Sequence, residues 1–152
     1  MKRLICVAAA LLLFLCGCAY TGEPVGKQVT GERFTSAAEA LGMQVNDREE
    51  DAPGEYETYL MAYSAEMTAE FMIVADEATS VQLYGSQKDN INQFYTEGDE
   101  RSESRGKTHT KFTLHTQDNF YILVRVERSV LLISGTLNST ESAQQLLSDI
   151  GY

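Results

Sequence analysis

Cysteine is scarce in this chain and confined to its beginning. All three cysteines, Cys6, Cys16 and Cys18, lie within the first 18 of 152 residues. The remainder of the chain has no thiol with which to close a disulfide, although small exported domains commonly depend on such bonds. We therefore expect its stability to come from a packed apolar core, and the chain is long enough to bury one in a single domain.

Basic residues are also few. When Lys2 and Arg3 are set aside, ten of the twelve basic residues remain against 22 acidic ones, which gives a net charge of −12. Proteins that bind nucleic acid neutralise its phosphates with lysine and arginine, and a face that lies on anionic lipid needs the same residues. The composition therefore predicts no nucleic-acid partner and no flat contact with a charged membrane surface.

Catalytic and metal-binding motifs are missing from the sequence. It holds no Gly-x-Ser-x-Gly elbow, no His-Glu-x-x-His helix and no glycine-rich phosphate loop. The two histidines, His109 and His115, lie in one predicted strand at a separation of roughly 20 Å, which is too far for them to share a metal. The acidic segment 47–55 lacks the alternating ligands of a calcium loop. We predict no catalytic residue, no metal site and no cofactor.

The chain does begin with a short leader. Lys2 and Arg3 precede an uninterrupted apolar run from Leu4 to Leu15. A helix of this length spans roughly 18 Å, whereas the hydrocarbon core of a membrane is about 30 Å thick. The pattern therefore favours a cleavable signal over a permanent transmembrane helix.

The end of this leader, Leu15-Cys16-Gly17-Cys18, resembles a bacterial lipobox, in which a small residue precedes a cysteine that is lipidated and becomes the new N-terminus. The resemblance implies cleavage between Gly17 and Cys18 and a lipid on Cys18. It implies that the protein is anchored by this lipid on the extracytoplasmic face of the cell membrane, or on the outer membrane if the host has two membranes. Secretion without a lipid is the alternative.

Three parts of the chain follow from this interpretation. Residues 1–17 are a lipoprotein signal peptide, residues 18–30 are the lipidated cysteine and a flexible tether, and residues 31–152 are a single domain. The tether is predicted because residues 19–30 combine glycine, proline and threonine without an apolar period.

Three segments of the domain have the apolar spacing of helices. The first follows Thr30 as N-cap and ends at Gly42. The second follows Asp76, and the third begins near Asn138 with a sequence like a capping box and ends before Gly151. The second helix is expected to bury one stripe of side chains: Val81, Tyr84, Lys88, Ile91 and Phe94.

Alternating patterns predict strands between these helices. Segment 56–74 is ambiguous, because its composition favours a helix while its apolar residues alternate with a period of two. We favour a hairpin that turns at residues 64–66. The segment 96–107 is polar and without periodicity, so it is predicted as a mobile loop. The other predicted strands start near Met43 or cover residues 109–115, 120–126 and 130–133.

The predicted order is helix, three strands, helix, three strands, helix. This order favours an α+β fold in one domain, built from two αβββ-like units and a C-terminal helix. Because most of the strands alternate apolar and polar residues, we expect an antiparallel sheet with the helices packed on one face.

The sequence is similar to a known group of proteins over most of its length. The lipobox, segment 34–45, segment 120–125 and the last residues, 147–152, resemble small uncharacterised lipoproteins of Firmicutes. The resemblance implies an exported lipoprotein and supplies no site residues.

Two pairs of residues are candidates for ligand binding. Tyr59 and Tyr63 point to the same side of the predicted hairpin, with Met61 between them, and such a stripe could bind a peptide, a glycan or a protein unless a helix covers it. Arg125 and Arg128 could bind an anionic ligand, or could pair with carboxylates of neighbouring strands.

These observations favour a non-enzymatic lipoprotein that serves as a binding, accessory or sensor domain in the cell envelope. The alternative is a small hydrolase-like envelope enzyme, which would require a deep pocket with His109 or His115 beside a carboxylate. A third hypothesis is a structural spacer.

Overall fold

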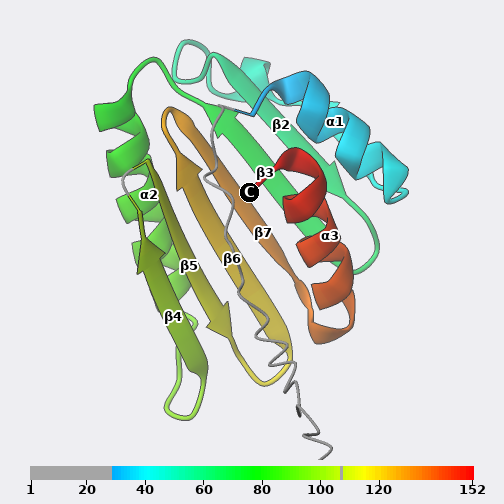
Figure 1. Cartoon of the computed structure of the whole chain (residues 1–152), viewed down its shortest axis with the longest axis vertical. Helices are drawn as coiled ribbons and strands as arrows, with labels where there is room; N and C mark the ends of the chain where they lie inside the picture. Colours follow the sequence, from blue (N-terminus) through cyan, green and yellow to red (C-terminus); the bar gives the residue numbers. More distant parts are fainter. Residues whose placement is uncertain (1–28, 107) are drawn as a thin grey trace, which may run out of the picture.

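The computed structural model describes residues 29–106 and 108–152 (Figure 1). The signal peptide, the cleavage between Gly17 and Cys18, the lipidation of Cys18 and the tether up to residue 28 lie outside the described residues. Within the described part, no helix is long and apolar enough to cross a membrane. The elements are α1 (Gly31–Ala40), β1 (Gln44–Asp47), η1 (Glu49–Asp51), β2 (Thr58–Tyr63), β3 (Met67–Ile73), α2 (Glu77–Asn92), β4 (Glu100–Arg105), β5 (His109–His115), β6 (Asn119–Val126), β7 (Ser129–Thr136), η2 (Leu137–Ser139) and α3 (Thr140–Ile150).

All seven strands form one antiparallel sheet in the order β1-β2-β3-β7-β6-β5-β4. Each half of the chain contributes a meander, and the two meanders join where β3 pairs with β7. In this central pair Phe71 lies opposite Leu131. The predicted single α+β domain with an antiparallel sheet is confirmed.

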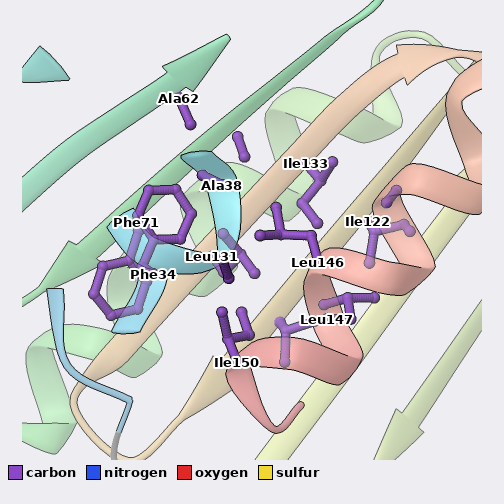
Figure 2. Close-up of a cluster of buried hydrophobic side chains, with 14 of the residues drawn as sticks. Phe34, Ala38, Ala62, Phe71, Ile122, Leu131, Ile133, Leu146, Leu147 and Ile150 are labelled. Carbon is purple, nitrogen blue, oxygen red and sulfur yellow. The ribbon is translucent and has the colours of Figure 1, made fainter. Parts of the chain in front are cut away.

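One face of the sheet is covered by α1 and α3 (Figure 1). The rings of Phe34 from α1 and Phe71 from β3 stack at 5.1 Å between centroids, and both are fully buried. Figure 2 shows Leu146, Leu147 and Ile150 of α3 above the apolar side chains of the central strands. This face holds the larger of two apolar clusters, which we call the α1/α3 core.

The expectation that all helices pack on one face is wrong, because α2 lies on the opposite face. Met72 of β3, Leu123 of β6 and Val130 of β7 point away from the α1/α3 core and pack with Tyr84 and Ile91 of α2. The central strands are apolar on both sides, so a helix is needed on each face to remove both sets of side chains from water.

The predicted stripe of α2 is also partly wrong. Tyr84 and Ile91 are buried, whereas Val81 and Phe94 are 50% and 56% exposed. The helix turns Ser80 toward the sheet instead, where its hydroxyl donates to the carbonyl oxygen of Glu127.

The predicted loop 96–107 contains strand β4, so the second half of the chain has four strands and not three. All six residues of β4 are exposed and none is apolar. They form a strand because their backbone pairs with β5, and a strand made only of polar residues has no hydrophobic alternation by which a sequence could reveal it.

The predicted starts of the first two helices and the hairpin are confirmed. The Thr30 hydroxyl accepts from the Arg33 amide at 3.3 Å, and the Asp76 carboxylate accepts from the Thr79 amide at 2.8 Å. Gly42 follows α1 with a φ of +74°, the left-handed conformation that glycine adopts without strain. β2 and β3 form the hairpin, and residues 64–66 form its turn.

The start of α3 differs from the prediction. The short helix η2 comes first, and Ser139, the residue before α3, makes no side-chain capping bond. Its buried hydroxyl donates to the carbonyl oxygens of Glu66 and Thr136 and ties the start of α3 to the sheet. The predicted capping box at Asn138 is therefore not formed.

Candidate functional site

The α2 side of the sheet is only partly covered. Within the described residues, helix α2 packs against β5, β6 and β7 and leaves the area nearer to β1 without a helix above it. Tyr59, Leu132 and Tyr121 form the border of this area and pack against the α2 cluster. We call this uncovered area the open face. Its members come from β2, β3, β7 and β6 and are half-buried, except Tyr63, which is exposed: Tyr59, Met61, Tyr63, Thr68, Glu70, Leu132, Ser134 and Tyr121.

Strand alternation and register place these side chains together. Leu60 and Ala62 of β2 pack into the α1/α3 core, so Tyr59, Met61 and Tyr63 between and beside them lie on the opposite side. The predicted orientation of the tyrosine pair is confirmed, while its role in binding stays a prediction. The register extends two rows across the sheet, Tyr63-Thr68-Ser134-Tyr121 and Met61-Glu70-Leu132.

Hydrogen bonds orient both tyrosines of β2. The Tyr59 hydroxyl donates to Oε2 of Glu70 at 3.0 Å, and the Tyr63 hydroxyl donates to Oε1 of Gln44 at 2.7 Å. Burial and the nearby charge of Glu70 raise the pKa of Tyr59 to about 12, so its hydroxyl remains a donor at neutral pH. The Tyr56 ring lies 5.0 Å from the Tyr59 ring and supports it from one side.

An aromatic pair and an open depression mark the end of the open face near the β2–β3 turn. Phe94, just after α2, stacks on Tyr121 at 5.2 Å with the two rings parallel within 1°. The depression has a volume of about 310 Å³. It is lined by Ser64, Ala65, Glu66, Met67, Thr68, Asn119, Tyr121, Ser134, Gly135 and Thr136.

The two candidate arginines have partners within the chain. Arg125 is buried, and its Nη1 donates to Glu77 of α2 at 3.3 Å and to the carbonyl oxygen of Glu127. Nη1 of Arg128 lies 2.8–2.9 Å from the two carboxylate oxygens of Glu57 and also donates to the carbonyl of Val74. These contacts fix α2 and the start of β2 to the sheet, so neither arginine belongs to the open face.

The histidines lie at the two ends of β5. His115 borders an open depression of about 500 Å³ together with Asp99 and Glu100. The Asp99 carboxylate there accepts from the backbone amide and hydroxyl of Thr96, so it serves a turn. Among residues 29–106 and 108–152, no three His, Cys, Asp or Glu residues are placed to hold a metal.

Sequence reasoning missed the members of the open face that β6 and β7 supply. Tyr121, Leu132 and Ser134 come from strands more than 50 residues away from β2, and only the pairing of β3 with β7 brings them beside Tyr63. The available signal was the alternation in segment 119–126, which separates Tyr121 from the buried Phe120 and Ile122.

Comparisons with solved structures give distant likenesses in fold. No protein-family model and no curated protein matches the sequence. A crystal structure from Thermotoga maritima, described as a GTP binding regulator, aligns over 84% of this chain and 90% of its own length, with a TM-score of 0.48 and 10% identity. A likeness at this level carries no functional argument.

Proposed function

We propose that this protein is a lipid-anchored, extracytoplasmic binding protein without enzymatic activity, and that it holds an envelope protein on its open face. The single observation that carries the proposal is the uncovered half of the α2 side, where tyrosine and methionine are gathered beside polar side chains. The lipobox-like sequence at Cys18 supports the location.

The chemistry of the open face fits a protein interface. Tyrosine offers a large apolar ring and a polar hydroxyl, and methionine adapts to the shape of a partner. Interface centres are rich in such residues and poor in charged ones. Of the eight members of the open face only Glu70 is charged, and it accepts from Tyr59. Arg48 borders the face, with its Nη1 3.6 Å from the sulfur of Met61.

Photo-crosslinking on intact cells of the native host tests the binding surface. A photoreactive phenylalanine analogue is placed at Tyr63, which is 37% exposed, or at Val81 on the outer side of α2, which is 50% exposed. We expect an adduct of constant mass from position 63 and none from position 81. No adduct at position 63, or the same adducts at both positions, would overturn the proposed surface.

Incorporation of labelled palmitate tests the anchor separately. We expect the full chain to take up the label, Cys18→Ala to abolish it and Cys16→Ala to leave it unchanged. Uptake that persists in Cys18→Ala would place the lipid elsewhere, and no uptake by the unaltered chain would favour plain secretion.

A further inference from the structure

The outer edge of β4 is the longer of the two sheet edges. β4 has six residues, all exposed, and among the strands of the described residues it pairs with β5 alone. The other edge strand, β1, has four residues, and α1 packs against it. An edge strand presents unpaired N–H and C=O groups, which can accept another strand.

The hydrogen-bond pattern shows which residues of β4 face outward. The Gly106 amide donates to the His109 carbonyl at 2.8 Å, and these two residues continue the β4–β5 register. Bonded and non-bonded pairs alternate in an antiparallel ladder. Ser102 and Ser104 therefore bond to β5, whereas Arg101, Glu103 and Arg105 direct their N–H and C=O groups to the free edge.

The side chains at the three outward positions alternate in charge, so two antiparallel copies of β4 can place opposite charges next to each other. If two copies of β4 pair antiparallel about Ser102, Arg101 of each copy lies opposite Glu103 of the other. Two such pairs follow from the symmetry, both at positions where backbone groups are free to bond. If the pair were centred on Glu103 instead, the two Glu103 carboxylates would lie opposite each other, and Arg101 of each copy would lie opposite Arg105 of the other. Like charges would then face each other at all three positions, which is unfavourable.

We propose that the β4 edge binds the β4 edge of a second copy of this chain, antiparallel and centred on Ser102, so that the two sheets become one. Like-charged edges resist such pairing, but this edge carries both signs in a self-complementary order. Within its own chain Glu103 accepts from Lys88 of α2 at 2.7 Å and from Arg105 at 3.3 Å, so in the dimer its carboxylate accepts from Arg101 of the second copy in addition to these partners. The open face is centred on β2, β3 and β7, toward the opposite edge of the sheet from β4, so pairing at β4 leaves it accessible and the dimer does not depend on the proposed function.

Disulfide cross-linking at the centre of the pair tests this register. Ser102 of the two copies would form a non-bonded pair with Cα atoms about 4.5 Å apart, within the range of a disulfide. We expect Ser102→Cys in the membrane-bound full chain to give a covalent dimer under mild oxidation. The unaltered chain, whose cysteines all lie at or before residue 18, measures the background.

Ser104→Cys is the matched control, because it lies on the same strand and the same side. In the proposed register the two copies of residue 104 are four positions apart along the strands, roughly 13 Å, which a disulfide cannot bridge. No dimer from Ser102→Cys above background, or equal yields from both variants, would overturn the proposal.

A charge reversal supplies an independent readout. Arg101→Glu opposes two pairs of carboxylates across the edge, and we expect it to weaken self-association of the full chain by on the order of tenfold in sedimentation. Arg48→Glu, at the far side of the sheet, changes the net charge equally and is expected to have no effect. Equal effects of both substitutions would show that total charge, not the edge, governs association.

Discussion

The two faces of the sheet differ in how completely helices cover them. On one face α1 and α3 lie over the strands, and the side chains beneath them, such as Phe71, Ile122 and Leu131, are apolar and fully buried. On the other face, α2 is the one helix among residues 29–106 and 108–152 that covers β5, β6 and β7. Along β3 the residues on that side change from buried Met72 to half-buried Glu70 and Thr68. Strand residues under a helix are thus apolar, and those without a helix above them are more polar. A partner can bind at the uncovered part without disturbing the core.

The largest effect is expected from the fully covered face. Phe34→Ala removes a ring that is completely buried and stacked on Phe71. Lost burial and the cavity left behind should lower the free energy of unfolding by about 3–5 kcal/mol. Urea denaturation followed by circular dichroism measures this change. A loss below about 1 kcal/mol would mean that α1 does not pack as described.

A smaller effect is expected under the single helix of the other face. Ile91→Ala truncates a buried side chain of α2 at the smaller of the two clusters. We expect a loss of about 2–3 kcal/mol in the same assay. An effect larger than that of Phe34→Ala would reverse the ranking of the two faces.

The cap of α2 should make stability depend on acid. The Thr79 amide holds the pKa of Asp76 below its ordinary value of 3.8. Because the folded-state pKa is the lower one, the ionised cap stabilises the fold above the unfolded-state pKa, and this contribution is lost as pH falls through the folded-state value. Asp76→Asn retains a capping oxygen but does not titrate, so its stability should fall less steeply in acid. If the free energy of unfolding fell equally steeply with decreasing pH in the unaltered chain and in Asp76→Asn, the capping role would be contradicted.

The smallest effect on stability is expected from the open face. Tyr63→Ala removes an exposed ring whose hydroxyl donates only to Gln44 among the described residues. The free energy of unfolding should change by less than about 0.5 kcal/mol, while the cross-link to the envelope partner from a photoreactive residue at Met61 should be lost. A strongly destabilised Tyr63→Ala would show that this tyrosine serves the fold.

The sequence predicts those parts of the fold whose signals are local. Thr30 and Asp76 mark helix starts by their capping chemistry, and alternation identifies the β2–β3 hairpin. Strand β4 is not predicted, because its exposed polar residues show no hydrophobic periodicity. The face of the sheet on which α2 packs is not predicted either, because it depends on which strands become neighbours, and that is a property of the whole sheet.

The candidate site also has a part that the sequence predicts and a part that it does not. Alternation alone is enough to put Tyr59 and Tyr63 on one side of β2. That no helix in the described part of the chain covers them, and that Tyr121 and Ser134 extend their surface, follows only from the pairing of β3 with β7. From the sequence, Arg125 and Arg128 are candidates for ligand binding just as the tyrosines are. Their carboxylate partners, Glu77 and Glu57, are 48 and 71 residues away along the chain, so the sequence does not reveal these ion pairs.

The most direct test of the open face compares two tyrosines with nearly equal exposure. Tyr63 on the open face is 37% exposed and Tyr95 beyond α2 is 38% exposed. A tyrosine-selective reagent is applied to intact host cells and to the purified full chain, and mass spectrometry gives the labelled fraction of each residue. We predict that Tyr63 is labelled less on cells than in the purified protein, because its partner covers it. Equal labelling of Tyr63 in both samples would contradict a bound partner on this face.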